Sequence, residues 1–162
     1  ELDQSATQQF KIQQLNKAHV DCSAVTYAAA DFTKNDWFQR LEEAGYDPSK
    51  KTIFLWEGVT LYLSELEVRR TLKTVKANSA AGSVVIADLY DFISLKFFNK
   101  YASKVFEATD ESLGGFGLDF STDHENALSK FVESENATSG KTYFMDNKTK
   151  KGTYMVVTEI LF

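Results

Sequence analysis

Two short, unbroken apolar runs limit most strongly what this chain can fold into. The first covers residues 52–56 (TIFLW) and the second residues 84–87 (VVIA). Apolar runs of this length without polar alternation are typical of strands buried on both faces of a parallel sheet. Between them, residues 64–75 carry apolar side chains at helical spacing, and Ser64 and Glu67 have the spacing of a capping box. The sequence therefore predicts a strand–helix–strand unit, with the second strand stopping at Asp88.

The same alternation extends towards the start of the chain. A helix is expected over residues 3–18 and a short strand within residues 23–30. A further short helix is expected to begin at Asn35 or Asp36 and to stop at Gly45, because these residue types suit the two ends of a helix. The order of elements before residue 52 is therefore helix, strand, helix.

After residue 87 the pattern becomes more helical and then changes. Residues 91–106 predict an aromatic-rich helix, and Thr122 with Glu125 has the capping-box spacing at the start of another. Residues 141–145 and 153–161 predict two strands joined by a polar turn. The fold class expected is α/β, a doubly wound and mainly parallel sheet with helices on both faces and a C-terminal antiparallel hairpin.

Composition supports one globular domain over residues 1–162. Hydrophobic residues make up 43% of the chain and aromatic residues 14%, which suffices for a core and argues against disorder. The formal net charge of −5 includes no basic stripe, so nucleic acid is not expected as a partner. No apolar run approaches the ~20 residues that span a bilayer, and no secretory signal pattern opens the chain. A cytoplasmic protein without a membrane partner is expected.

A metal site is not expected. Cys22 is the only cysteine, and His19 and His124 are the only histidines. These residues do not supply the usual cysteine and histidine ligand sets of protein-bound metals.

Acidic residues follow successive predicted strands. Asp31, Glu57 and Asp88 each come directly after one, and Asp3 is expected to follow a fourth. In doubly wound sheets, ligands bind outside the carboxyl ends of the strands, where carboxylates accept hydrogen bonds from ribose hydroxyls, an adenine amino group or an α-ammonium group. Any one of these acids alone is more simply explained as a solvated residue that closes a strand. Their joint occurrence favours a nucleoside-type ligand without defining a reaction.

Three segments resemble successive motifs of one family. These segments are residues 2–8 (LDQSATQ), 36–48 (DWFQRLEEAGYDP) and 56–63 (WEGVTLYL). They resemble the leucine carboxyl methyltransferase-like group of class I S-adenosylmethionine-dependent methyltransferases, which includes a bacterial O-methyltransferase branch. The resemblance runs in order and spacing from residue 1 to about Asp88, and more loosely to the hairpin. Its most specific part is the glutamate–glycine pair followed at fixed spacing by tyrosine and leucine.

The resemblance implies S-adenosylmethionine as the cofactor and O-methyl transfer to a carboxylate or hydroxyl of a small molecule or peptide. By position, Asp3 resembles the acid that binds the ribose hydroxyls. Asp31 resembles the acid near adenine, with Phe32 supplying a neighbouring contact. Glu57, with the adjacent Gly58, resembles the acid close to the methionine part of the cofactor.

Residues on the acceptor side are less defined. Tyr62 resembles the family tyrosine that lines the acceptor, and packing in the core is an equally weighted alternative. No general base is identified, and neither histidine has a placed partner that would make it one. An aromatic group on the helix predicted over residues 91–106 could line an acceptor pocket, but most of it is expected to pack as core. Its members are Phe92, Phe97, Phe98, Tyr101 and Phe106.

The chain also departs from the family pattern. Ser5 stands where proline is usual, and Trp56 where a small residue is usual. The family's first strand and its glycine-rich loop are not represented, and residues 114–117 (GGFG) lack the strand-before, helix-after setting of such a loop. Without that central strand, both neighbouring strands would keep unpaired edges. We therefore expect a segment of the same natural protein, or a second copy in a homodimer, to complete the sheet.

Two other functions are considered. A non-catalytic, truncated methyltransferase-like domain acting in interactions is the main alternative, because the glycine-rich loop is not represented. A dinucleotide-dependent oxidoreductase would share the sheet class, but no segment resembles a pyrophosphate-binding loop, and fold alone does not define function.

Overall fold

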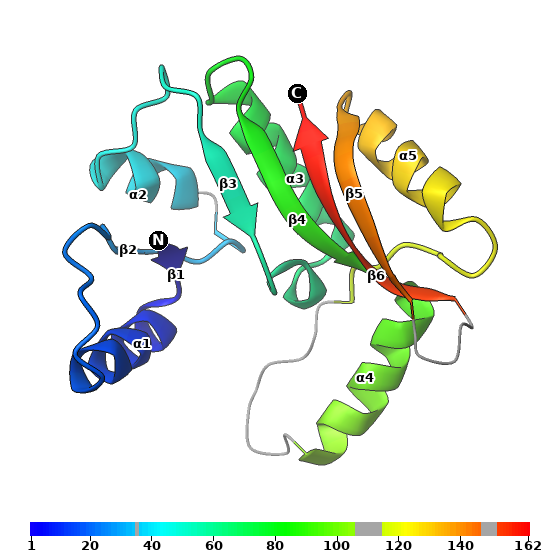
Figure 1. Ribbon diagram of the computed structural model, residues 1–162, viewed down its shortest axis with the longest axis horizontal. Helices are drawn as coiled ribbons and strands as arrows, with labels where there is room; N and C mark the ends of the chain where they lie inside the picture. Colours follow the sequence, from blue (N-terminus) through cyan, green and yellow to red (C-terminus); the bar gives the residue numbers. More distant parts are fainter. Residues whose placement is uncertain (35, 106–114, 147–151) are drawn as a thin grey trace. The chain divides into compact units, whose positions relative to one another are not determined.

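The chain divides into two compact units, Glu1–Pro48 and Ser49–Phe162. The structure, a computed structural model, describes residues 1–34, 36–105, 115–146 and 152–162 (Figure 1). The expectation of a single domain over residues 1–162 stays a prediction.

The first unit is built on a short parallel strand pair. Strand β1 (Leu2–Asp3) leads into helix α1 (Ser5–Lys17), and strand β2 (Ala28–Ala29) is followed by helix α2 (Trp37–Glu43). Leu2 pairs with Ala28 and Asp3 with Ala29, in parallel register. The predicted helix–strand–helix order is confirmed, and Asp3 ends a strand as expected.

Aromatic contacts hold α2 in the first unit. The rings of Phe32 and Trp37 lie 5.3 Å apart, those of Trp37 and Phe38 also 5.3 Å, and those of Phe38 and Tyr46 5.4 Å. Asp36 begins α2 but makes no side-chain capping hydrogen bond, and Asn35, the other predicted cap, lies outside the described residues. Buried aromatic packing therefore stabilises this seven-residue helix more than capping does.

The second unit contains a four-stranded sheet in the order β3-β4-β6-β5. Its strands are β3 (Ile53–Trp56), β4 (Val84–Tyr90), β5 (Thr138–Asp146) and β6 (Thr153–Leu161). β3 and β4 are parallel, whereas β6 is antiparallel to both β4 and β5. The α/β class and the C-terminal antiparallel hairpin are confirmed.

One 3₁₀ turn and three helices accompany this sheet: η1 (Thr60–Tyr62), α3 (Glu65–Ala77), α4 (Phe92–Val105) and α5 (His124–Ser134). The predicted capping box at Ser64 and Glu67 is present. The second capping-box prediction is wrong, because Asp123 rather than Thr122 caps α5 and its carboxylate accepts from the backbone N–H of Asn126 at 2.9 Å. A carboxylate also interacts more favourably with the positive end of the helix dipole than a hydroxyl does.

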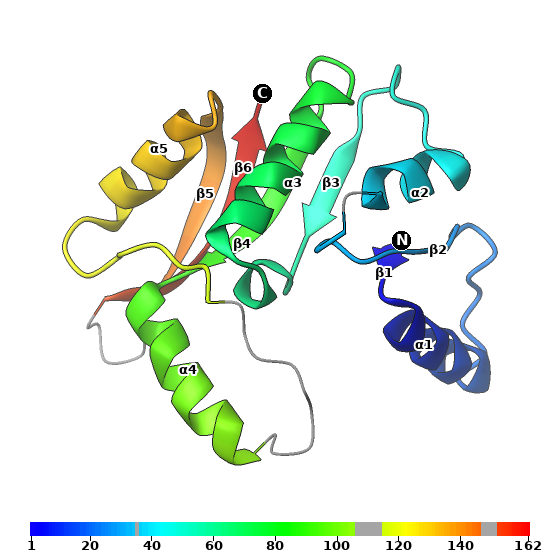
Figure 2. The same ribbon diagram turned by 180° about the vertical axis from the view of Figure 1, so that it is seen from behind.

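Helices α3 and α5 lie on the same face of this sheet, as Figures 1 and 2 show together. The buried side chains between them and the strands form the core. They are Val68, Leu72, Val75, Val85, Ala87, Leu89, Leu128, Phe131, Val132, Val156 and Ile160. Such packing is the dominant favourable contribution to the stability of a unit of this kind.

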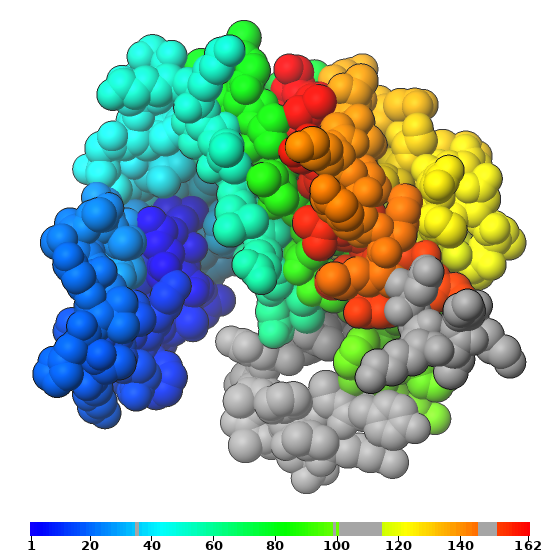
Figure 3. All heavy atoms as spheres, in the orientation of Figure 1, coloured from blue at the N-terminus to red at the C-terminus, as the bar shows by residue number. Residues whose placement is uncertain are grey.

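The opposite face of the sheet is open within this unit. Ile53 and Leu55 are each 69% exposed, and atoms of all four strands lie at the surface in Figure 3. The prediction that residues 52–56 are buried on both faces is therefore wrong. The physical reason is that β3 is the outer strand of this sheet and α3 covers only the other side of it.

The described strands do not form one continuous sheet. β1 and β2 make a two-stranded sheet, and the other four strands make a separate one. Among the described residues β3 pairs only with β4, so no described strand lies along its second edge. A continuous sheet would have contradicted the expectation that a further segment completes it.

Helix α4 does not pack as predicted. Leu95 is buried, but Phe92, Phe97 and Phe98 are exposed, so core packing is wrong for these three phenylalanines. Among the described side chains of this helix, Leu95 is the one that is buried. The Tyr101 side chain and Phe106 lie outside what the structure describes. No helix in the described ranges is both long and apolar enough to span a membrane.

Two leucines of α3 test this packing. Leu72 is 1% exposed and Leu66 is 74% exposed. We expect Leu72→Ala to lower the free energy of unfolding by about 2–5 kcal/mol through lost burial and a residual cavity. Leu66→Ala should change it by less than about 0.5 kcal/mol. Urea denaturation followed by circular dichroism measures both, and equal effects would contradict the assignment of the core face.

Candidate functional site

A cleft of about 480 Å³ lies beside the carboxyl ends of β1 and β2 in the first unit. Its lining residues are Gln4, Ser5, Ala6, Ala29, Ala30, Asp31, Lys34, Asp36 and Arg40. Because β1 and β2 are parallel, the residues that follow both strands meet at one edge of the pair. The cleft therefore combines the first turn of α1 with the loop that carries Asp31.

Asp31 is held in an ionised, hydrogen-bonded state. Its Oδ1 accepts from the hydroxyl of Thr33 at 2.7 Å and from the backbone N–H of Thr33 at 2.8 Å. The bond from the Thr33 hydroxyl is the main cause that lowers the pKa of the Asp31 carboxyl, and the charge of Lys34 adds to it. A carboxylate fixed in this way is a strong hydrogen-bond acceptor at neutral pH.

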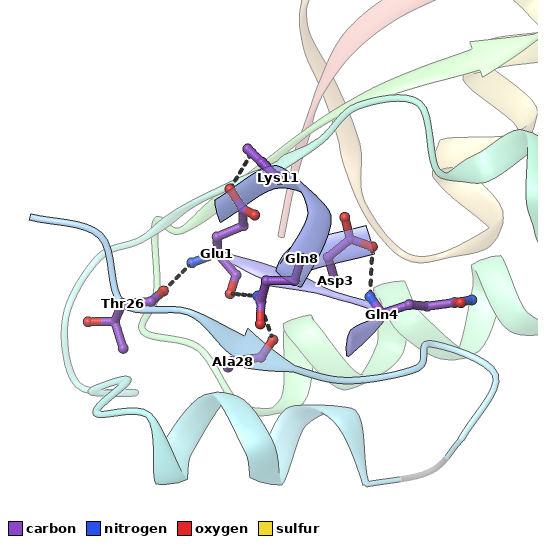
Figure 4. A network of polar contacts seen from close by, with 7 residues as sticks. All are labelled: Glu1, Asp3, Gln4, Gln8, Lys11, Thr26 and Ala28. Atoms are coloured by element: carbon purple, nitrogen blue, oxygen red, sulfur yellow. Dashed lines mark hydrogen bonds and ion pairs between the residues drawn. The ribbon is translucent and has the colours of Figure 1, made fainter. Parts of the chain in front are cut away.

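Asp3 and Phe32 lie beside this cleft in sequence but do not line it. Asp3 accepts through Oδ1 from the backbone N–H of Gln4 at 2.7 Å, immediately before α1 (Figure 4). Phe32 packs against Trp37. Contacts of these two residues with a cofactor stay predictions.

Gln8 is a structural residue that sequence reasoning missed. Its buried side-chain amide donates to the backbone oxygen of Glu1 at 3.4 Å and to that of Ala28 at 3.3 Å (Figure 4). It thereby ties the start of β1 to β2 from α1, and the ion pair of Lys11 with Glu1 supports the same end of the strand. The available signal was the position of Gln8 inside the family-like motif at residues 2–8. A side-chain amide that is buried in a protein is normally hydrogen-bonded.

The cleft carries both signs of charge. Arg40 contacts Asp36 at 3.5 Å and Glu43 at 3.0 Å, so its guanidinium is already shared between two carboxylates. Lys34 lines the same cleft as Asp31. This balance suits a ligand with hydroxyl and amino donors better than a polyanion, whose charge the two carboxylates would repel.

A second cluster forms at the carboxyl ends of β3 and β4. Asp88 accepts through Oδ2 from the backbone N–H of Gly58 and from the hydroxyl of Tyr90, both at 2.8 Å. Its backbone oxygen accepts from the hydroxyl of Thr60 at 2.7 Å. The prediction that the strand stops at Asp88 is wrong, because β4 continues to Tyr90 through its pairing with β6.

Tyr90 acts in this cluster as a hydrogen-bond donor. Burial is the main cause that raises the pKa of its hydroxyl far above the ordinary value, and the hydrogen bond to Asp88 and the charges of Asp88 and Glu57 act in the same direction. The hydroxyl therefore keeps its proton at physiological pH and is not a general base.

Glu57 and Tyr62 are both accessible. Glu57 follows β3 directly and is exposed, and Tyr62 at the end of η1 is 48% exposed. The choice between acceptor contact and core packing with the hydroxyl at the surface stays open for Tyr62. A contact of either residue with a ligand stays a prediction.

The remaining sequence candidates have structural explanations. His124 lies at the start of α5 with its ring centroid 4.4 Å from that of Phe144. A Cβ on Gly117 would lie 2.8 Å from the backbone of Phe92, so close packing explains this glycine. Gly114 lies outside the described residues. Among the residues that are described, no group of three or more His, Cys, Asp or Glu side chains could hold a metal ion.

Comparison with solved structures concerns the fold. A solved O-methyltransferase family protein from Burkholderia thailandensis superposes with a TM-score of 0.52 at 10% identity, covering 99% of this chain and 42% of that one. Similarity at this level shows the fold alone, so this chain has part of the fold of that O-methyltransferase family protein.

Sequence comparison finds matches to one family. The leucine carboxyl methyltransferase profile matches residues 1–76. A Mycobacteroides abscessus protein named "Putative S-adenosyl-L-methionine-dependent methyltransferase" is 33% identical over 91 residues, which are 56% of this chain and 30% of the relative. A second protein of that name and organism is 26% identical over 148 residues, 91% of this chain and 47% of the relative. Residues 1–76 match the leucine carboxyl methyltransferase family, and the resemblance is confirmed over this stretch; the chain spans less than half the length of both relatives.

The ionisation of Asp31 is testable by pH titration. Because hydrogen bonds from Thr33 lower its pKa, they stabilise the fold above the unfolded-state pKa, and this contribution is lost as pH falls through the lower folded-state value. We expect Thr33→Val to raise the Asp31 pKa towards the ordinary value, measured by NMR of the side-chain carboxyl. Thr7→Val, an exposed substitution in α1 of the same unit, is the control and should leave that pKa unchanged.

Proposed function

We propose that this chain supplies part of an S-adenosylmethionine-dependent O-methyltransferase, which acts on a carboxylate or hydroxyl group of a small molecule or peptide. One observation carries the proposal. The cleft at the ends of β1 and β2, with Asp31 on its wall, lies inside the stretch that matches the leucine carboxyl methyltransferase family.

The residues around the cleft fit the nucleoside half of this cofactor. The Asp31 carboxylate accepts hydrogen bonds from amino or hydroxyl donors, and Asp3 stands at the end of the neighbouring strand for the ribose. Phe32 supplies an apolar contact next to Asp31. The mixed charge of the cleft suits adenosine, which carries several donors and no net charge.

For the methionine half, the family resemblance points to Glu57 in the turn after β3. Glu57 is an exposed carboxylate next to Gly58, whose backbone has φ of +67° and so takes the left-handed conformation that glycine adopts at no steric cost. An acid at this point attracts the α-ammonium group of a methionine moiety. Tyr62 lies five residues further on and is proposed to contact the methyl acceptor.

The chemistry demands mainly positioning. When bound, S-adenosylmethionine would supply an activated methyl group for transfer to an acceptor oxygen, and the residues of this chain would hold the two in line. A carboxylate acceptor needs no base, which agrees with a chain whose Tyr90 stays protonated. A hydroxyl acceptor needs a base that the described residues do not identify.

We also propose that a further strand, from the same natural protein or from a second copy, pairs with the open edge of β3. The support is the exposure of Ile53 and Leu55 on an edge strand that pairs only with β4 among the described residues. Long, apolar, unpaired edges are prone to recruit strands from other chains.

Cofactor binding is tested with S-adenosylhomocysteine by calorimetric titration of the chain, after circular dichroism shows that it is folded. We expect binding that Asp31→Ala or Glu57→Ala weakens by about tenfold each, the loss expected for one charged hydrogen bond. Asp21→Ala is the matched control for Asp31, since Asp21 accepts in the same way from Ser23 at 2.9 Å but does not line the cleft. Glu42→Ala, an exposed glutamate of α2, is the control for Glu57.

The outcome separates the two functions considered from sequence. A folded chain that produces no heat with this ligand would contradict the proposed cofactor site. The non-catalytic interaction domain would then be the better explanation.

The open edge is tested by sedimentation velocity. We expect the chain to self-associate with increasing concentration and Leu55→Lys to reduce that association, because a charge on an edge strand opposes strand addition. Leu66→Lys is the control, since Leu66 is similarly exposed on α3. A monomer at every concentration, unchanged by Leu55→Lys, would contradict edge pairing between copies.

A further inference from the structure

Asp88, a residue within β4, makes two hydrogen bonds to the turn that follows β3. Its side chain accepts from Gly58 and its backbone oxygen accepts from Thr60, at 2.8 and 2.7 Å. Thr60 is fully buried, and Asp88 is only 7% exposed. One strand residue therefore fixes the turn on both sides of Val59.

The same turn carries the two accessible residues of the proposed site. Glu57 precedes Gly58, and Tyr62 follows Thr60 at the end of η1. With both Gly58 and Thr60 held to β4, the backbone between Glu57 and Tyr62 has little freedom. A fixed backbone loses less entropy when a ligand binds to its side chains.

The buried carboxylate of Asp88 lowers the stability of the folded state. Its Oδ1 is buried and has no hydrogen-bond partner among the described residues. A buried carboxylate oxygen without a donor destabilises the folded state, and such a group in a native protein calls for an explanation. Tyr90 donates to Oδ2 as well and keeps the carboxylate aligned with Gly58.

We propose that Asp88 is a positioning residue of the methyltransferase site, which holds the turn so that Glu57 and Tyr62 are presented to the ligand in a fixed arrangement. The inference rests on the proposed function for its ligand. Asp88 itself does not contact the ligand, since its carboxylate is buried and acts through Gly58. Its contribution to affinity therefore depends on Glu57.

The first measurement needs no ligand. Amide hydrogen exchange at Gly58, followed by NMR, should accelerate by about tenfold in Asp88→Ala, the loss of one hydrogen bond of ~1.4 kcal/mol. Asp88→Asn should keep exchange slow, because its side-chain oxygen still accepts from Gly58. Unchanged exchange at Gly58 in Asp88→Ala would overturn the proposal.

The second measurement is the affinity for S-adenosylhomocysteine in a double-mutant cycle. Asp88→Ala should weaken binding by about tenfold in the wild-type background and by much less in the Glu57→Gln background. Asp88→Asn should restore most of the affinity. Equal losses in both backgrounds would overturn the proposal, because Asp88 would then not act through Glu57.

Two threonines keep the test decisive if Asp88→Ala fails to fold. Thr60→Val removes the bond to the Asp88 backbone oxygen and should weaken binding, also less in the Glu57→Gln background. Thr71→Val is its matched control, since Thr71 is also buried, in α3, and its hydroxyl has no hydrogen-bond partner among the described residues. A wild-type chain that does not bind this ligand would overturn the proposed function, whereas exchange at Gly58 would still show whether Asp88 holds the turn.

Discussion

The pairing of β4 with two neighbours of opposite direction organises the second unit. β3 runs parallel to β4 on one side, and β6 runs antiparallel to it on the other. Val85, Ala87 and Leu89 alternate along β4 towards the buried face under the helices. The intervening positions include Asp88 and Tyr90, which lie opposite Val157 and Met155 of β6. The register that buries one set of side chains therefore also fixes where the polar cluster lies.

The two units use parallel strand ends in different physical ways. In the first, two-residue strands cannot bury much apolar surface, and a buried glutamine and an ion pair hold the strands together, while tilted and edge-to-face aromatic rings hold α2. In the second, an apolar core under α3 and α5 fixes the strands, which then tolerate an incompletely satisfied carboxylate next to a tight turn. The free energy gained from the apolar core offsets the cost of burying the incompletely hydrogen-bonded carboxylate of Asp88.

The sequence pattern predicted the helices better than it predicted which faces of the strands are buried. Ser64 and Glu67 specify the start of α3 by a local capping geometry that needs no tertiary contact. Exposure of Ile53 and Leu55 was not predictable, because an apolar run looks the same whether or not a neighbour covers it. From the sequence, Asp88 was predicted to end a strand. Its backbone pairing with Val157 and its side-chain hydrogen bond to Gly58 involve residues 69 and 30 positions away, which a local sequence pattern does not reveal. At the candidate site, Asp31 was predicted, but two residues were missed: Gln8, which bonds to residues 7 and 20 positions away, and Tyr90, which donates to Asp88 two positions away.

The turn that carries Glu57 directly follows the four-residue strand β3, whose second edge is open. Only the β4 side of β3 is paired within the described residues, while Ile53 and Leu55 remain at the surface. A strand paired on one edge and covered on one face is held less firmly than a central strand. Asp88 compensates at the turn itself, where it holds Gly58 and Thr60 independently of what pairs with β3. A strand added at the open edge would hold β3 itself, while Asp88 holds the turn that follows it. Completion of the sheet and order at the proposed site are therefore physically coupled.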